Sequence, residues 1–174
     1  LKIEAEIGLC EIFGQQSKQQ CVILRPPMMY GPKNKGNMLT LLKVASNKIP
    51  LPLKTVGRKR SMLYVENLCD AILSVIRNDR NTQTSEVRSY FVKDNHDVTS
   101  RELYSLIFRG MHSNDGVFWL PFSVLRFCAV VGSFLERLTN KAWPFNNSVF
   151  LRLFGEYRFS DQKFRADYAW SPPY

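Results

Sequence analysis

The sequence contains few of the residues that build metal sites or disulfide networks. Its 174 residues include only four cysteines and two histidines. The cysteines, which are Cys10, Cys21, Cys69 and Cys128, are far apart and form no Cys-x-x-Cys pair. No metal site is therefore expected. Cysteines that stand singly in apolar stretches favour buried, reduced thiols, as in a cytoplasmic protein.

Long apolar runs and a signal peptide are also missing. The longest apolar run, Pro121 to Phe134, is too short to cross a bilayer as a helix and contains Arg126. Residues 1–13 include three glutamates, which excludes a signal peptide at that position. The sequence starts without methionine, inside a helical pattern. We therefore expect a cytoplasmic protein without a transmembrane span, of which this chain is one part.

Acidic residues are absent between Glu11 and Glu66, although this stretch contains ten lysines and arginines and the chain has a net charge of +9. A region with one sign of charge attracts anions, and phosphate is the obvious candidate. Three of its lysines are expected to be ordinary solvated charges: Lys18, Lys43 and Lys48. The cluster at residues 58–60 precedes a strand-like run, which would hold it firmly enough to bind a ligand.

The composition is otherwise that of a folded globular domain, with 45% apolar and 22% charged residues. Apolar residues recur at helical spacing in six stretches: 1–13, 38–45, 66–77, 103–107, 122–138 and 147–154. A capping box from Thr99 to Glu102 begins the fourth. Strand-like runs occupy residues 21–24, 61–65 and 89–92. Short strands that alternate with helices predict an α/β fold with a helical appendage.

A glycine-rich phosphate loop is the remaining absence. The nine glycines are scattered singly, so the chain contains no G-x-G-x-x-G turn. The continuous apolar run at residues 21–24 predicts a parallel strand covered on both faces. It ends in a loop rich in proline and glycine, where an α/β sheet presents its ligands. Any dinucleotide site would need sequence outside this chain to complete it.

Four motifs follow one another along the chain: Arg25 to Pro32, Gly36 to Met38, Arg60 to Ile72 and Phe164 to Pro173. Together they resemble the carboxyl-terminal half of NAD-dependent epimerases and dehydratases, which are extended short-chain dehydrogenase/reductases. The resemblance implies the carboxyl-terminal part of a Rossmann-type NAD-binding fold with a small, mostly helical substrate-binding subdomain. Residues 1–36 would end the Rossmann-like core, and residues 37–174 would form the substrate-binding region with interleaved core strands and helices.

By the same resemblance, Lys2 would be the catalytic lysine of a Tyr-x-x-x-Lys motif. The run from Lys2 to Glu6 matches the lysine and the residues that follow it. The tyrosine would lie four residues before Lys2, outside this chain. Lys2 would bind the ribose hydroxyls of the nicotinamide nucleotide and lower the pKa of that tyrosine. An exposed helix lysine without a catalytic role is the alternative.

The resemblance also assigns contacts to the cofactor and the diphosphate. Pro26, Pro27 and Met28 would lie against the nicotinamide and the sugar, with a rigid turn as their alternative role. Asn37 and the backbone of Met38 would bind the diphosphate at the start of a helix, where N–H groups attract anions. An N-cap is the alternative role of Asn37.

Three further positions complete the implied substrate site. Leu51 and Leu53 would pack on the uracil ring, although ordinary edge-strand packing fits them equally well. Arg60 would bind the diphosphate through its fork of donors. A second phosphate-binding arginine would be either Arg152 or Arg158.

The implied activity is C4 epimerisation of a UDP-hexose or UDP-N-acetylhexosamine through a 4-keto intermediate, with NAD as cofactor and NADP as the alternative. One-way 4-dehydrogenation, reduction or dehydration of a UDP-sugar, as in bacterial polysaccharide biosynthesis, is the alternative within the family. The full-length protein could be a homodimer, and this chain alone is expected to be inactive. A basic nucleic-acid-binding module is the alternative from another class. It is disfavoured because aromatic residues concentrate after Tyr90 and not among the lysines.

Overall fold

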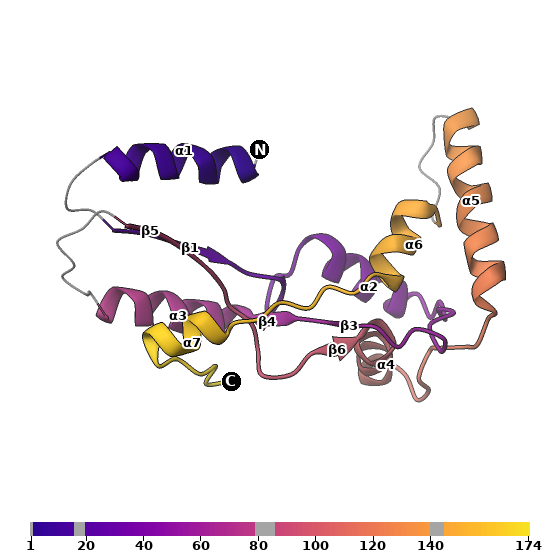
Figure 1. Cartoon of the computed structure of the whole chain (residues 1–174). Helices are drawn as coiled ribbons and strands as arrows, with labels where there is room; N and C mark the ends of the chain where they lie inside the picture. The colour runs from indigo at the N-terminus through magenta and orange to yellow at the C-terminus, as the bar shows by residue number, and fades with distance from the viewer. Residues whose placement is uncertain (1, 16–19, 79–85, 140–144) are drawn as a thin grey trace. The chain divides into compact units, whose positions relative to one another are not determined.

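The chain forms two compact units, each assembled from separate stretches of sequence. The structure is a computed structural model that describes residues 2–15, 20–78, 86–139 and 145–174 (Figure 1). Unit 1 comprises Leu1–Pro32, Ser61–His96 and Phe159–Tyr174. Unit 2 comprises Lys33–Arg60 and Asp97–Arg158. Each unit has an apolar core of its own.

Unit 1 is an α/β unit built on parallel strand pairs. Its elements are α1 (Lys2–Gln15), β1 (Gln20–Arg25), β2 (Met28–Tyr30), β4 (Met62–Tyr64), α3 (Val65–Arg77), β5 (Glu86–Phe91) and α7 (Gln162–Tyr168). β1 pairs in parallel with β5, from Gln20 opposite Glu86 to Arg25 opposite Phe91. β2 pairs in parallel with β4. The predicted α/β class is confirmed.

Aromatic side chains make up much of the core of unit 1. Tyr90 on β5 is buried against Phe164 and Tyr168 of α7, with ring centroids 5.6 Å apart in both pairs. Edge-to-face contacts of this kind add to the stabilisation that burial provides. The Tyr90 hydroxyl donates a hydrogen bond to Asp167 Oδ2 at 2.6 Å. These contacts hold the short helix α7 on the sheet.

Unit 2 is mostly helical. Its elements are α2 (Gly36–Ser46), β3 (Lys59–Arg60), β6 (Val98–Thr99), α4 (Ser100–Met111), α5 (Phe122–Thr139) and α6 (Asn147–Phe154). The two-residue strands β3 and β6 pair antiparallel. The loop between α2 and β3 contributes Leu53 and Val56 to a core that also contains Tyr104 and Phe108 of α4. Apolar residues spaced every three or four positions explain why these stretches are helical.

Local sequence sets the ends of several helices. At the start of α4, Glu102 N donates to Thr99 Oγ1 at 3.0 Å, and Thr99 N donates to Glu102 Oε2 at 2.8 Å. This capping box was predicted and is confirmed. At the start of α6, Val149 N donates to Asn146 Oδ1 at 2.9 Å. α7 ends at Ala169, which has a φ of 48° in the left-handed region that glycine adopts more easily.

α5 packs closely on α6 and on Phe145, the residue before the N-cap of α6. Leu125 and Ala129 of α5 are buried with Phe150 of α6. Gly132 lies against the backbone carbonyl of Phe145, and a Cβ atom at position 132 would collide with that oxygen. The close approach of the two chain segments therefore requires glycine at this point.

Three expectations from the sequence are wrong. The four cysteine thiols are free, but Cys10, Cys69 and Cys128 are exposed and Cys21 is only half-buried, because larger apolar residues fill the inward positions. β1 is also half-buried, since its sheet has two strands among the described residues. The loop expected after β1 contains the strand β2, whose partner β4 is distant in sequence.

Candidate functional site

Arg60 is buried at the end of β3 in unit 2. The residue is 9% exposed. Its Nη2 donates a hydrogen bond to the carbonyl oxygen of Arg152 at 2.6 Å and a longer one to that of Leu153 at 3.4 Å. The guanidinium carbon lies 5.9 Å from the centre of the Tyr157 ring, which is within the range of a cation–π contact. Backbone carbonyls and an aromatic face therefore hold the guanidinium in place.

The Arg60 guanidinium is not fully paired within the protein. Its Nε is buried without a hydrogen-bond partner. No carboxylate among the described residues forms an ion pair with it. Burial lowers the pKa of Arg60, yet an arginine stays charged at neutral pH. Because buried charges in proteins are normally paired, the arrangement suits an anionic ligand.

The amino-terminal end of α2 is a second feature of unit 2 that suits an anion. Its N-cap residue, Lys35, makes no side-chain capping hydrogen bond, and Gly36 has a φ of 66°. Asn37 is exposed in the first turn, whereas Met38 is buried. Uncapped N–H groups and the helix dipole favour negative charge at this position. Since Lys35 occupies the N-cap, the alternative in which Asn37 caps the helix is wrong.

The predicted contacts of the diphosphate are thus in one unit. Asn37, Met38 and Arg60 all belong to unit 2. In the part of the chain that the structure describes, no hydrogen bond links Asn37 to Arg60. Binding of one diphosphate by both residues remains a prediction.

Leu51 and Leu53 lie in the loop between α2 and β3. Leu53 is 1% exposed in the core of unit 2. Leu51 is half-buried and bridges the segment after α4: its N–H donates to Gly116 O at 2.9 Å, and Phe118 N donates to Leu51 O at 3.0 Å. These are contacts of ordinary packing. Contact of either leucine with a uracil ring remains a prediction.

The candidate catalytic lysine belongs to unit 1. Lys2 is the first residue of α1, and its side chain lies outside the part that the structure describes. On the same helix, Glu6 forms a two-pronged ion pair with Arg25, the last residue of β1. The hydrogen bond from Arg25 lowers the pKa of Glu6. This ion pair connects α1 to the carboxyl end of β1.

The predicted cofactor contacts follow directly after β1. Pro26 is exposed and Pro27 is half-buried. Met28 begins β2 and pairs with Met62 of β4. The two prolines lack N–H donors, so this turn offers ring surface and carbonyl oxygens at the end of a parallel strand. Its chemistry suits the face of an aromatic ring more than a phosphate.

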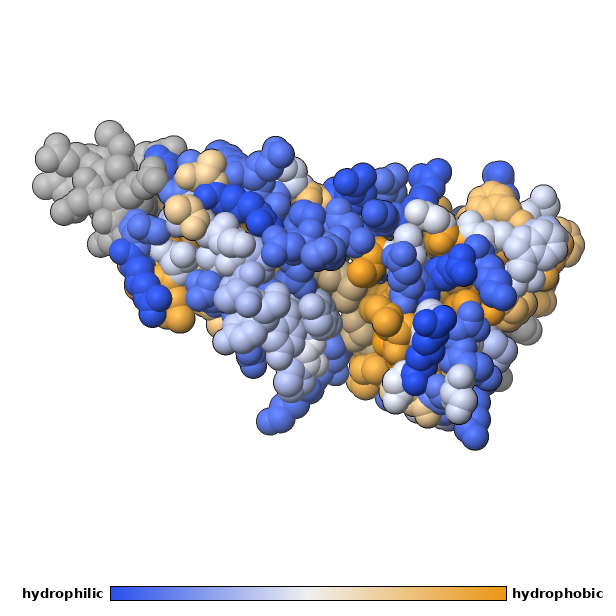
Figure 2. Space-filling model, turned by 90° about the horizontal axis from the view of Figure 1, so that it is seen from below, coloured by the Kyte–Doolittle hydropathy of each residue, from blue (hydrophilic) through white to orange (hydrophobic). Residues whose placement is uncertain are grey.

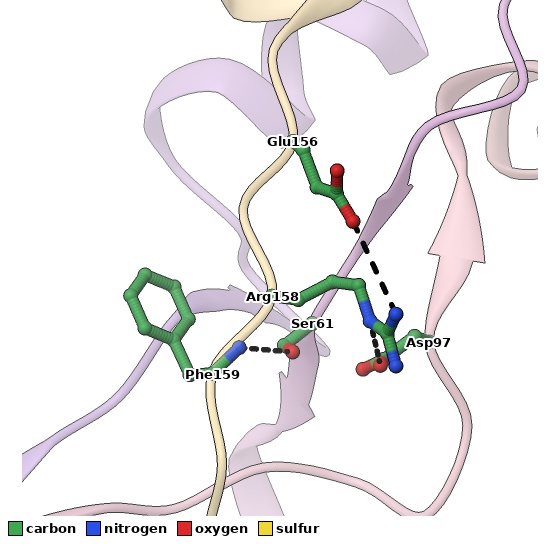
Figure 3. A network of polar contacts seen from close by, with 5 residues as sticks. All are labelled: Ser61, Asp97, Glu156, Arg158 and Phe159. Atoms are coloured by element: carbon green, nitrogen blue, oxygen red, sulfur yellow. Dashed lines mark hydrogen bonds and ion pairs between the residues drawn. The ribbon is translucent and has the colours of Figure 1, made fainter.

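The two candidates for a second arginine differ in their partners. Arg158 Nε donates to Asp97 Oδ2 at 3.3 Å, and its Nη1 lies 4.0 Å from Glu156 Oε1 (Figure 3). Arg152 is exposed, and within the described ranges its side chain has no ion pair. Carboxylates already neutralise Arg158, whereas Arg152 is available and offers its carbonyl to Arg60.

Sequence reasoning missed a buried carboxylate in unit 1. Asp94 accepts hydrogen bonds from Tyr64 N at 3.1 Å and from Asn67 Nδ2 at 2.7 Å. Burial and the hydrogen bond with Asp94 raise the pKa of Tyr30 to about 12. Asp94 thereby fixes the start of α3 against the end of β4. No local motif marks this residue, because its partners are far away in sequence.

The fold and the strand-end loop define this chain as a Rossmann-type α/β protein. Solved structures with this fold include a UDP-N-acetylglucosamine 4-epimerase from Bacillus cereus, which is 13% identical with a TM-score of 0.63 over 99% of this chain and 50% of that chain. Pal from Bacillus thuringiensis is 16% identical with a TM-score of 0.62 over 99% and 47% of the two chains. WbmF from Bordetella bronchiseptica, solved with NAD+ and UDP, is 16% identical with a TM-score of 0.57 over 99% and 47%.

Sequence comparison identifies the family. The profile of the NAD dependent epimerase/dehydratase family matches residues 2–89, and the chain belongs to this family. A UDP-glucose 4-epimerase from Vibrio cholerae is 36% identical over 103 residues, which are 59% of this chain and 30% of that protein. The chain thus spans between about a third and a half of the length of the relatives it matches.

Proposed function

We propose that this chain is the carboxyl-terminal, substrate-binding part of an NAD-dependent nucleotide-sugar 4-epimerase. The substrate would be a UDP-hexose or a UDP-N-acetylhexosamine, epimerised at C4 through a 4-keto sugar. Membership of the family and the similarity to a UDP-glucose 4-epimerase over 103 residues support this assignment. Unit 1 would serve the cofactor side, and unit 2 would bind the sugar nucleotide.

One observation carries the proposal: a buried guanidinium without an anionic partner among the described residues. Arg60 donates through Nη2 to backbone carbonyls, and its Nε is unused. A charged group removed from water in this way is costly unless a ligand neutralises it. A diphosphate supplies several acceptor oxygens and two negative charges, which match the fork of donors on arginine. Arg60 would therefore bind the pyrophosphate bridge.

Two other groups in unit 2 would complete the anion site. The uncapped amino terminus of α2, with exposed Asn37, would donate hydrogen bonds to phosphate oxygens. Arg152 is the better candidate for the second arginine, because Arg158 is already paired with Asp97. Leu51 would contact the base from its half-buried position, as would Leu53 after a local rearrangement.

The cofactor side of the proposal rests on the turn after β1. In this family NAD supplies hydride transfer at the sugar carbon. Pro26, Pro27 and Met28 would offer an apolar surface to the nicotinamide ring. Lys2 would bind the ribose hydroxyls and lower the pKa of a tyrosine that this chain does not contain. Because that tyrosine and a glycine-rich loop are needed for the reaction, we expect little or no turnover by this chain alone.

Two alternatives make different predictions. A one-way 4-dehydrogenase or reductase would accumulate or consume NAD(P)H stoichiometrically, whereas an epimerase regenerates its cofactor in each cycle. A nucleic-acid-binding module would use the acid-free stretch, lose affinity steeply with salt and show no preference for UDP. The epimerase assignment is favoured because the chain belongs to the epimerase/dehydratase family and is similar to a UDP-glucose 4-epimerase over 103 residues.

Calorimetric titration of the full chain with UDP, UDP-GlcNAc and a DNA oligomer tests the proposal. Both UDP ligands should bind at least tenfold more tightly than the oligomer at moderate salt. Arg60→Gln should reduce UDP binding at least tenfold, because a charge-assisted contact to phosphate is lost. Arg109→Gln, which removes an exposed arginine from the last turn of α4, should leave it unchanged. Tighter binding of DNA, or equal affinity of the wild-type and Arg60→Gln chains, would contradict the proposal.

A further inference from the structure

The outward side of α5 is apolar from Val124 to Leu138. Three large side chains on it are more than half exposed: Phe127 at 69%, Phe134 at 60% and Leu138 at 67%. Val124, Val130 and Val131 are exposed beside them. At 3.6 residues per turn these positions fall within about 120° of the helix circumference. We call this set of six side chains the α5 stripe.

Most of the α5 stripe lies on the side of the helix away from the buried contacts with α6, and only its border at Val130 and Phe134 lines a shallow pocket with Asn147 at the start of α6. Leu125, Ala129 and Gly132 are buried against the α6 region, and they lie on the opposite side of the helix from the stripe. Among the described residues, the stripe side chains belong to neither of the two apolar cores identified in unit 2. The buried contacts of α5 in the described part of unit 2 therefore come mainly from the other side of the helix.

The charges on α5 are arranged around the stripe. Arg126 and Arg137 are exposed on the same border of the stripe, within about 40° of Val130 around the helix and about 16 Å apart along its axis. The only acidic residue of the helix, Glu136, is on the buried side and accepts a hydrogen bond from Asn146 Nδ2 at 2.8 Å. The outward half of α5 is thus apolar with a basic edge and no acidic group.

We propose that the α5 stripe docks on an anionic lipid bilayer surface, with α5 lying in the plane of the interface. An interfacial helix has an apolar face that enters the acyl boundary and basic residues that reach the anionic headgroups. Arg126 and Arg137 are placed to do so, and the net charge of +9 favours the same surface. None of the described helices is long and apolar enough to cross a membrane. This inference does not depend on the proposed function.

Two exposed aromatic residues precede α5 in the sequence. Trp119, which is 63% exposed, and Phe118 come shortly before α5. Tryptophan is typical of the boundary between headgroups and acyl chains. Figure 2 shows several patches of apolar surface, in orange, among hydrophilic residues in blue.

A second copy of this chain is the less favoured occupant. Two stripes packed face to face would bring the basic edges close to each other, with Arg126 and Arg137 from both copies and no acidic residue on the outward half of α5 to pair with them. Like charges next to each other in an interface are unfavourable. An anionic headgroup layer supplies the missing negative charge.

Flotation of the full chain with lipid vesicles tests the inference. The chain should float with vesicles that contain phosphatidylglycerol and much less with vesicles of phosphatidylcholine alone. The double variant Phe127→Ser/Phe134→Ser should reduce binding at least tenfold. Arg126→Gln/Arg137→Gln should reduce binding to the anionic vesicles roughly tenfold, since each cation near such a surface contributes to affinity. Leu106→Ser, which removes an exposed leucine from α4, is the matched control and should bind like wild type.

Several results would overturn the inference. They are failure to float with anionic vesicles, equal binding to neutral vesicles, and an equal loss in the Leu106→Ser control. Concentration-dependent dimerisation that disappears in the Phe127→Ser/Phe134→Ser variant, without vesicle binding by wild type, would assign the stripe to a second copy. The arginine variant changes only exposed positions, so its effect on binding is measurable even where the phenylalanine variant folds poorly. Circular dichroism of each variant establishes that α5 is still helical.

Discussion

Replacement of Arg60 by methionine should separate its role in binding from its role in stability. Methionine fills a similar volume without charge. Of the two carbonyls that accept from Arg60, that of Leu153 also accepts from Ser100 Oγ at 2.7 Å, so only the carbonyl of Arg152 loses its partner. The lost hydrogen bond costs about 1–3 kcal/mol, and the lost contact with Tyr157 costs about 0.5–1 kcal/mol.

Removal of the buried charge works in the opposite direction. The penalty of holding an ion away from water amounts to several kcal/mol, and a buried ion can often be replaced by an apolar residue without loss of stability. We therefore expect the free energy of unfolding of Arg60→Met to be within about 1 kcal/mol of that of wild type. This difference corresponds to a change in Tm of roughly 2–4 °C for a chain of this size. If Arg60 were instead required to hold unit 2 together, its replacement would lower the free energy of unfolding by about 3–5 kcal/mol.

Differential scanning calorimetry with and without UDP measures both effects. A ligand at about 100 times its Kd stabilises the folded state by about 2.7 kcal/mol, or roughly 5–10 °C in Tm. Wild type and the Arg109→Gln control should show this shift, and Arg60→Met should show about half of it or less, because a tenfold weaker ligand stabilises by only about 1.4 kcal/mol at the same concentration. A loss of about 3 kcal/mol or more in Arg60→Met, together with a UDP-induced shift like that of wild type, would refute the reasoning.

Three further predictions concern stability. Thr99→Ala should cost about 1 kcal/mol in urea denaturation, because Glu102 N loses the Thr99 Oγ1 acceptor. The hydrogen bond from the backbone N–H of residue 99 lowers the pKa of Glu102 from 4.5, and because the variant keeps this bond, both chains should lose stability in parallel as the pH falls below 4.5; an unchanged urea midpoint at neutral pH would argue against the capping box. Ala169→Gly should stabilise the chain by about 0.5–1 kcal/mol, since it relieves the left-handed backbone; a lower urea midpoint would contradict this. Burial and the hydrogen bond with Asp167 raise the pKa of Tyr90 from 10.0 to about 12. The free energy of unfolding of wild type should therefore fall as the pH rises from 10 towards 12, and that of Tyr90→Phe should fall less steeply. Titration followed by ultraviolet absorbance checks the pKa, and identical pH dependence of stability in the two chains would disprove the prediction.

The parts of the fold that could be predicted are those encoded locally. α2, α3 and α6 follow from apolar residues at helical spacing within each segment. The capping box at Thr99 involves residues three positions apart, so its pattern is visible in the sequence. β2 could not be predicted, because three residues after two prolines give no periodic signal and the pairing with β4 is long-range. The exposure of the cysteines depends on which helix face meets the core, which composition does not determine.

The candidate site divides in the same way. Arg60 could be singled out because it stands in a basic cluster before a strand and matches a family motif. Its surroundings could not, since the carbonyl that holds it belongs to Arg152, 92 residues later. Nothing near Arg60 in sequence indicates that it is buried or that Tyr157 lies beside it. The choice between Arg152 and Arg158 likewise needed the position of Asp97.

The two sides of α5 should tolerate substitution very differently, and Gly132 marks the less tolerant side. The glycine allows the helix to meet the Phe145 backbone, so almost any substitution at that position would wedge the two segments apart. Among the described residues, Phe127 and Phe134 belong to neither apolar core of unit 2, so substitution there should affect folding little. A saturation library selected only for folding should accept nearly every residue at 127 and 134 but retain glycine at 132. Selection that also preserved the outward phenylalanines would point to a constraint beyond the fold itself.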